Sequence, residues 1–157
     1  MLLVMAITHT GYLPVPGAGG AITLMHIPVI LAGILSGPFA GAGMGLIFGI
    51  SSVYDIPPHD WVVQVIPRIL MGLVSSVVFL SARYYATAES RATLGSAVAA
   101  LAGSLTNTLG VTLFACAKGL FSLSDMMGVI LVHGSIEALL AVIITLPVAV
   151  SIHHSPN

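Results

Sequence analysis

The feature that most constrains this chain is the length of its stretches without charge. No Asp, Glu, Lys or Arg occurs from Met1 through Tyr54, from Ala92 through Ala117, or after Glu137. Only 6% of the 157 residues are charged and 57% are hydrophobic, whereas about 25% of the residues in a soluble domain are charged. About 20 apolar residues in a helix cross a hydrocarbon core of about 30 Å. The sequence therefore predicts an integral membrane protein.

Composition also excludes several classes of function. Four basic residues and a net charge of −1 do not neutralise a run of phosphates, so no nucleic acid is expected as a partner. The single cysteine, Cys116, excludes a disulfide framework and a site of several thiolates, and we expect no metal site and no cofactor. The phosphate loop, the His-Glu-x-x-His helix and the Gly-x-Ser-x-Gly turn are all missing from the sequence. We therefore expect no enzymatic activity, and any ATP hydrolysis would take place in partner subunits.

The apolar runs predict helices, because they are continuous and do not alternate with a period of two. Glycine and proline residues separate the runs, Gly37 and Pro38 among them. We expect a single membrane domain over residues 1–157, an all-α bundle of six transmembrane helices whose first helix is short or truncated. The predicted spans are residues 2–13, 21–35, 39–53, 62–82, 94–116 and 127–152.

The basic residues predict how the bundle is oriented. Six spans place both termini on one side of the membrane, together with the loop that holds Arg83 and Arg91. Basic residues concentrate in cytoplasmic loops, so that side is expected to be the cytoplasm. The loop with Asp55 and Asp60 then lies outside, and so does Lys118, which departs from the rule.

Glycine recurs at every fourth position from the second predicted span into the third. The series is Gly33, Gly37, Gly41, Gly45 and Gly49. This spacing puts small residues on one helix face, where two backbones can approach closely in lipid. One interpretation is tight packing inside the bundle. The other is that this face docks on another membrane protein.

Polar side chains inside a span are costly and are therefore candidates for function. Arg68 and Glu137 carry opposite charges within predicted helices, and His133 lies one turn before Glu137 on the same face. Arg68 and Glu137 either form a buried ion pair or line a pocket for the polar head of a solute. Asn107 is the best single ligand-binding candidate because its amide both donates and accepts, although an interhelical hydrogen bond would also explain it.

Four further residues are weaker candidates for the same site. His26 either contacts a ligand or forms a hydrogen bond that supports packing beside Pro28, and Gln64 lies at membrane depth. Trp61 and Tyr12 lie at the ends of predicted spans. Such aromatic residues either form the interfacial belt or stack on a flat ligand that enters from outside.

Several runs of the sequence resemble one known family. ITLMHIPVILAG (residues 22–33), the Gly-Pro pair at 37–38 and GLIFGISS (45–52) are similar to the second and third helices of the substrate-binding S component of energy-coupling factor (ECF) vitamin transporters. PRILMG (67–72) resembles the fourth helix, GSLTNT (103–108) the fifth, and IEA (136–138) with IITLPV (143–148) the sixth. The resemblance covers nearly the whole chain in order.

The resemblance implies a multi-pass protein of the bacterial plasma membrane that captures a small water-soluble vitamin with high affinity. Its partners would be the vitamin, the membrane lipid, a transmembrane coupling subunit and two cytoplasmic ATPase subunits. The family's pocket is built from the loop after the first helix and from helices four to six, which implies roles for Tyr12, Gln64, Arg68, Asn107, His133 and Glu137. Its first helix docks through an Ala-x-x-x-Ala face, to which Ala6 and Thr10 are the nearest equivalent here.

The polar candidates leave the substrate open. Arg68 favours a carboxylate such as that of pantothenate, whereas Asn107, Glu137 and Trp61 suit a neutral ring such as hydroxymethylpyrimidine or pyridoxine. The rival hypothesis from another class is a structural or assembly subunit of a larger membrane complex, which packs through its glycine faces and transports no solute.

Overall fold

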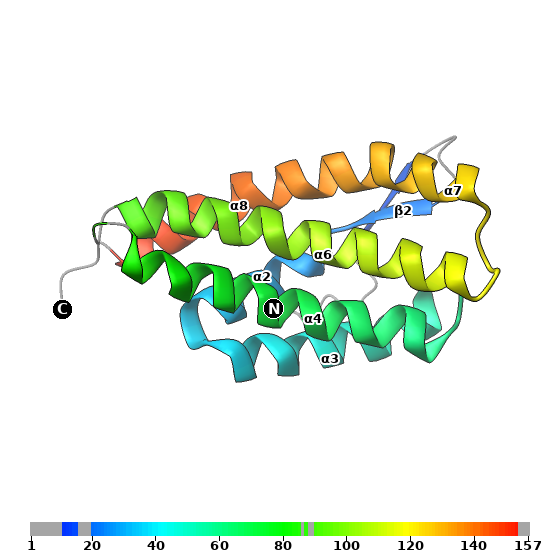
Figure 1. Cartoon of the computed structure of the whole chain (residues 1–157), viewed down its shortest axis with the longest axis horizontal. Helices are drawn as coiled ribbons and strands as arrows, with labels where there is room; N and C mark the ends of the chain where they lie inside the picture. Colours follow the sequence, from blue (N-terminus) through cyan, green and yellow to red (C-terminus); the bar gives the residue numbers. More distant parts are fainter. Residues whose placement is uncertain (1–10, 16–19, 86, 88–89, 154–157) are drawn as a thin grey trace.

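The computed structural model describes residues 11–15, 20–85, 87 and 90–153. It is a bundle of helices with a two-stranded sheet near one end (Figure 1). The strands are β1 (Tyr12–Val15) and β2 (Gly20–Thr23), and the α-helices are α2 (His26–Ser36), α3 (Pro38–Asp55), α4 (Trp61–Ser81), α6 (Ser96–Ala117), α7 (Leu123–Gly128) and α8 (Ser135–His153). The chain also forms a 3-10 turn, η1 (Ala82–Tyr84), and two π-helical segments, η2 (Arg91–Gly95) and η3 (Val129–Gly134).

The helices are arranged so that the middle of the bundle is formed by α4 and α6, which lie side by side. α3 packs along α4, and α8 packs along α6 (Figure 1). The short helix α2 contacts α3, α4, α6 and α8 over one half of the bundle, and the β1–β2 sheet lies in the other half (Figure 1). Because α2 begins only midway along the bundle, a cavity has room to form between α4, α6 and α8 in the half with the sheet.

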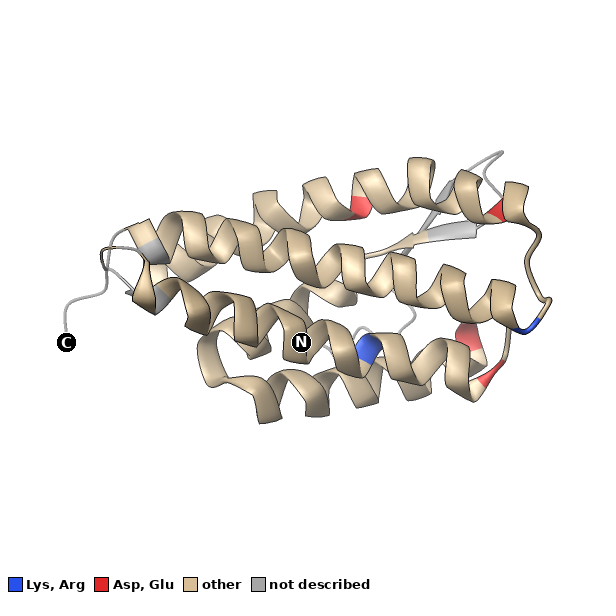
Figure 2. Ribbon diagram, in the orientation of Figure 1, with Lys and Arg blue, Asp and Glu red and all other residues tan. Residues whose placement is uncertain are grey.

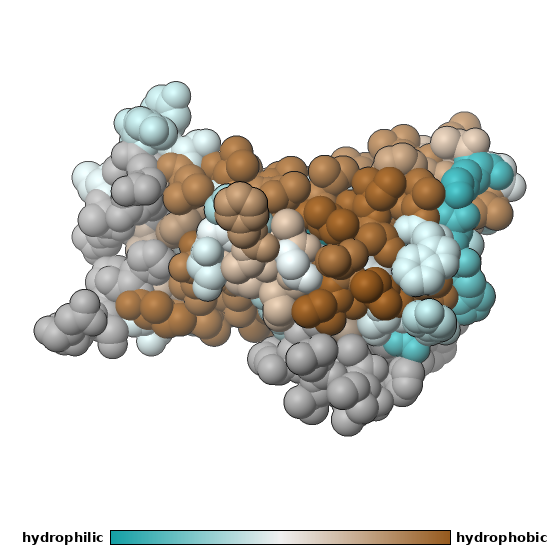
Figure 3. Space-filling view, turned by 90° about the horizontal axis from the view of Figure 1, so that it is seen from below, coloured by the Kyte–Doolittle hydropathy of each residue, from teal (hydrophilic) through white to brown (hydrophobic). Residues whose placement is uncertain are grey.

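The surface is apolar over most of its length, as a membrane protein requires. Figure 3 shows a broad hydrophobic band across one face, with hydrophilic residues at the right-hand end of the molecule in that view. Within the described residues, three helices are long and apolar enough to cross a membrane, namely Trp61–Ser81, Ala92–Ala117 and Leu123–Ile152. The prediction of a helical, membrane-embedded chain is confirmed. The count of six spans stays a prediction.

The segment before α2 corrects the sequence prediction. Residues 12–13 and 21–23 were expected inside helical spans, but they lie in antiparallel strands with Tyr12 opposite Thr23. The β-branched residues Ile22 and Thr23 favour extended backbone. The Thr23 hydroxyl accepts a hydrogen bond from the Met25 amide at 3.1 Å, and this turn ends β2 directly before α2 begins. The second helical segment therefore starts at His26 and not at residue 21.

The glycine series lies where α2 and α3 cross α4. A Cβ atom on Gly33 or on Gly41 would lie 2.6 Å from the carbonyl oxygen of Gly72 in α4. Two backbones can approach this closely only where side chains are missing. Gly37 has a different role, since its φ of 89° turns the chain between α2 and α3, a conformation that side chains disfavour.

These contacts bear on the residues that were predicted to dock a partner. The face formed by Gly33, Gly41 and Gly45 is covered by α4, which is the packing interpretation of the series. Docking of a partner on these three glycines stays a prediction, and the packing of α4 over them argues against it. Ala6 and Thr10 lie outside the described residues.

Among the residues that Figure 2 colours by charge, several lie at the end of the bundle where α7 lies. There the Lys118 ammonium forms an ion pair with Asp60, with 2.7 Å between Nζ and Oδ2. Asp60 also caps α4 by accepting hydrogen bonds from the amides of Val62 and Val63. The pair gives Lys118 a local partner and joins the last turn of α6 to the first turn of α4.

Replacing Asp60 by asparagine is expected to lower the melting temperature slightly, because asparagine keeps the helix cap and removes the ion pair. The hydrogen bond from Lys118 lowers the pKa of the Asp60 carboxyl below its ordinary value of 3.8. A carboxyl with a lowered pKa stabilises the fold above its ordinary pKa and loses that contribution as the pH falls through the lowered value. Thermal unfolding of both proteins from pH 7 to pH 3 should show the difference shrinking at the acidic end. A difference that grows there would contradict the role of the pair.

Candidate functional site

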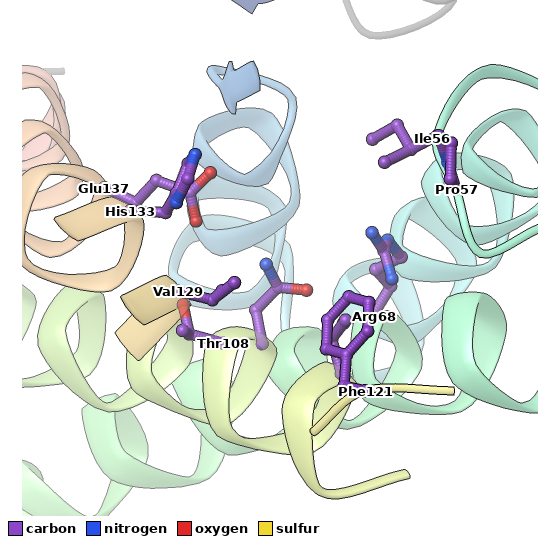
Figure 4. A pocket seen from close by; sticks show the side chains of 10 residues that line it. Ile56, Pro57, Arg68, Thr108, Phe121, Val129, His133 and Glu137 are labelled. Atoms are coloured by element: carbon purple, nitrogen blue, oxygen red, sulfur yellow. The ribbon is translucent and has the colours of Figure 1, made fainter. Parts of the chain in front are cut away.

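A cavity of about 130 Å³ lies between α4, α6, η3 and the beginning of α8. Figure 4 shows its lining side chains, which come from helices far apart in the sequence and from two connecting segments. The polar lining residues are Arg68, Asn107, Thr108, His133 and Glu137, and the apolar ones are Ile56, Pro57, Val111, Phe121 and Val129. Four of the eight predicted substrate-binding residues thus meet at one cavity.

Arg68 lies on one wall of the cavity and is only 3% exposed. Pro67 lies inside α4 just before it, and a proline donates no hydrogen bond to the carbonyl four residues earlier. The Arg68 Nη1 atom donates to the carbonyls of Gln64 at 2.8 Å and of Val63 at 3.5 Å. The guanidinium also lies over the Phe48 ring, 4.8 Å from its centroid. These contacts fix a buried positive charge at the edge of the cavity.

The α6 wall and the η3 wall offer polar atoms without protein partners. Among the described residues, the buried Asn107 Oδ1, Thr108 Oγ1 and both ring nitrogens of His133 have no hydrogen-bond partner. Buried polar atoms in native proteins are nearly always hydrogen-bonded to protein or water. Because their residues line the cavity, these atoms are candidates to bind a ligand. The π-helical turn η3 carries His133 into the cavity, and such turns are frequent at functional sites.

Glu137 lies beside His133 and faces Arg68 across the cavity (Figure 4). Its Oε1 atom accepts a hydrogen bond from the Thr23 amide at 2.9 Å, and its main-chain oxygen lies 3.1 Å from His26 Nε2. The sequence allowed either an ion pair with Arg68 or a place in a pocket. In the structure Glu137 is a cavity residue whose carboxylate is also bonded to the end of β2.

Three of the other predicted ligand-binding residues are placed away from the cavity lining. Gln64 is fully buried, and its Nε2 atom donates to the carbonyls of Ile56 at 2.9 Å and Pro58 at 2.8 Å. It therefore holds in place the segment that covers one side of the cavity. Trp61 is 53% exposed and makes an edge-to-face contact with Tyr54.

His26 and Tyr12 complete the predicted set. His26 is fully buried at the start of α2 and bonds to main-chain atoms, which agrees with the packing interpretation of this residue. Tyr12 lies in β1, and its side chain is outside what the structure describes.

The sequence did not single out most of the apolar lining. Ile56, Pro57, Val111, Phe121 and Val129 carry no signal in a chain where apolar residues also cover the lipid-facing surface. Thr108 could have been found, because it is the neighbour of Asn107 in a polar triplet of an otherwise apolar helix. In the part of the chain that the structure describes, no group of three His, Cys, Asp or Glu side chains could hold a metal ion.

The family of the chain follows from its similarity to known proteins. Residues 1–149 match the family model described as ECF transporter, substrate-specific component. The chain is also 30% identical over 163 aligned positions to the pantothenic acid transporter PanT of Lactococcus lactis subsp. cremoris (strain MG1363). That alignment covers 86% of this chain and 79% of the relative. The residues matched by the family model include every residue that lines the cavity. The chain therefore belongs to the family of substrate-specific components of ECF transporters.

Proposed function

We propose that this protein captures pantothenate for an ATP-driven ECF importer in the bacterial plasma membrane. The observation that carries the proposal is the buried Arg68 guanidinium on one wall of a cavity whose other walls present Asn107 and His133. Guanidinium groups bind carboxylates through two parallel hydrogen bonds, and such charge-assisted bonds are about twice as strong as neutral ones.

The chemistry of pantothenate matches the distribution of polar atoms around the cavity. The molecule has a carboxylate at one end, an amide in the middle and two hydroxyl groups at the other end. Arg68 would bind the carboxylate, Asn107 the amide, and His133 with Glu137 the hydroxyl groups. The name of the relative PanT supports the same substrate. A neutral ring such as pyridoxine would make no use of the positive charge on Arg68.

The position of the cavity fits uptake from outside the cell. It lies in the half of the bundle that ends at Asp60 and Lys118, and the distribution of basic residues predicts that this end faces outward. The energy for release would come from a transmembrane coupling subunit and two cytoplasmic ATPases, as in other ECF importers. The protein itself would bind and not catalyse.

Replacing Asn107 by alanine is expected to weaken pantothenate binding about 10- to 100-fold, because the ligand amide would lose its partner in a buried site. The matched control is Thr106→Ala on the same helix, since the Thr106 hydroxyl bonds to the Ala102 carbonyl at 2.7 Å and does not line the cavity. Isothermal titration of both purified variants in detergent measures the effect. Equal affinities for the two variants would contradict the assignment of Asn107.

A structural or assembly subunit is the remaining alternative, and the same experiment addresses it. Such a subunit would bind no pantothenate in the unmodified form. Asn107→Ala would then lower the melting temperature, and there would be no pantothenate affinity to lower.

A further inference from the structure

We propose that His26 is a positioning residue that holds β2 and the start of α2 against the cavity wall formed by Glu137. This inference rests on the proposed binding function of the cavity. It assigns a role in binding to a residue that does not line the cavity. Three residues from three elements take part, namely Thr23 at the end of β2, His26 at the start of α2 and Glu137 in α8. Thr23 contributes main-chain atoms, His26 its side chain, and Glu137 both its carboxylate and its main-chain oxygen. We call these three residues the junction.

The junction is a ring of close contacts between polar atoms of the three residues. His26 Nδ1 lies 2.5 Å from the Thr23 carbonyl oxygen, and His26 Nε2 lies 3.1 Å from the Glu137 carbonyl oxygen. The Thr23 amide donates to Glu137 Oε1 at 2.9 Å, which closes the ring. Both neighbours of the imidazole are acceptors, so a neutral ring donates to one of them and an imidazolium donates to both.

All three residues of the junction are buried. His26 is fully buried, Thr23 is 4% exposed and Glu137 is 6% exposed. Such positions are shielded from bulk water, and a buried donor or acceptor left without a partner is costly. The strands β1 and β2 are only four residues long, and a two-stranded sheet of this size has little stability of its own. The position of β2 therefore depends on the hydrogen bond from Thr23 to Glu137 in α8 and on the contact of the Thr23 carbonyl with His26 in α2.

The junction connects this packing to the cavity through Glu137. One carboxylate both lines the cavity and accepts the Thr23 amide. Displacement of β2 would release the carboxylate from the rotamer in which it faces Arg68 across the cavity. His26 does not line the cavity and contacts the lining residue Glu137 only at its main-chain oxygen. We therefore expect its loss to act mainly on how long a ligand stays bound.

The first test needs no ligand and uses hydrogen–deuterium exchange of the full chain in detergent. His26→Ala is expected to speed amide exchange of residues 20–25 at least about ten-fold, because it removes both side-chain contacts. His26→Asn keeps a donor near the Nδ1 position and is expected to give an intermediate rate. His59→Ala is the matched control, since His59 also bonds to a main-chain carbonyl, that of Val53, but lies outside the junction. It should leave the exchange of residues 20–25 unchanged.

The second test measures pantothenate dissociation by stopped flow. His26→Ala is expected to increase the dissociation rate about ten-fold or more, with the association rate changed less than about three-fold. Glu137→Gln keeps an oxygen acceptor for the Thr23 amide and should keep residues 20–25 protected, whereas Glu137→Ala should not.

The outcomes separate the junction from the proposed function. Unchanged exchange in His26→Ala, or faster exchange with an unchanged dissociation rate, would overturn the positioning role. Failure of the unmodified protein to bind pantothenate would overturn the proposed function. The exchange comparison would then still decide whether the junction holds β2.

Discussion

Replacing Arg68 by glutamine is expected to weaken pantothenate binding at least about 100-fold. Truncating one partner of a buried charge pair costs about 2–5 kcal/mol, and each 1.4 kcal/mol is a factor of ten in affinity. Glutamine keeps a polar group near the Gln64 carbonyl but supplies neither the charge nor the fork of two donors. Titration of the purified variant with pantothenate measures the loss.

Two comparisons show whether the loss arises in the cavity. Arg68→Lys keeps the positive charge without the fork of two donors. Its affinity for pantothenate should lie between those of the unmodified protein and Arg68→Gln. Arg68 also contacts Phe48 and two carbonyls of its own helix, so melting temperatures without ligand must be measured alongside. Weak binding with an unchanged melting temperature supports a ligand contact. Full affinity in Arg68→Gln would contradict it.

Replacing Gly45 by alanine is expected to destabilise the protein by about 1–3 kcal/mol and to lower its affinity for pantothenate. The new Cβ would lie 2.9 Å from the Cα of Ile69 and against the carbonyl group of Arg68. Backbone cannot move aside as a flexible side chain can, so α3 and α4 must separate, and overpacking of this kind costs about that amount. The shift would also move Arg68, the residue proposed to bind the carboxylate.

Gly43 provides a control in the same helix. A Cβ at Gly43 would meet nothing within 4 Å, and alanine is the better helix former. Gly43→Ala should therefore leave the melting temperature in detergent unchanged or slightly higher. If the two variants melted alike, the close contact between α3 and α4 would not be what holds this part of the bundle.

Much of the fold followed from the distribution of charge. Long apolar runs that do not alternate with a period of two form helices in lipid, and the structure has three described helices long and apolar enough to cross a membrane. Pairs such as Arg68 and Glu137 could be selected as site candidates because ionisable residues at membrane depth are rare and need a reason to be there. Segments distant in the sequence then bring them to one cavity.

The two strands and the roles of Gln64 and His26 could not be predicted from the sequence, for physical reasons. The strands β1 and β2 replace expected helix because hydrogen bonds to distant residues stabilise them, as between Thr23 and Glu137, and local sequence does not encode such contacts. For Gln64 and His26 the sequence leaves both a ligand contact and a packing role open, because both are polar residues at membrane depth. In the structure their side chains contact main-chain carbonyls beside the cavity.

The most direct measurement of the proposed binding mode compares pantothenate with pantothenol, the analogue in which a primary alcohol replaces the carboxylate. Titrating the unmodified protein with each compound isolates the one group that Arg68 is proposed to recognise. We expect one pantothenate to bind per chain, and pantothenol to bind at least about 100-fold more weakly. Equal affinity for the two compounds, or no binding of either, would contradict capture of a carboxylate by this cavity.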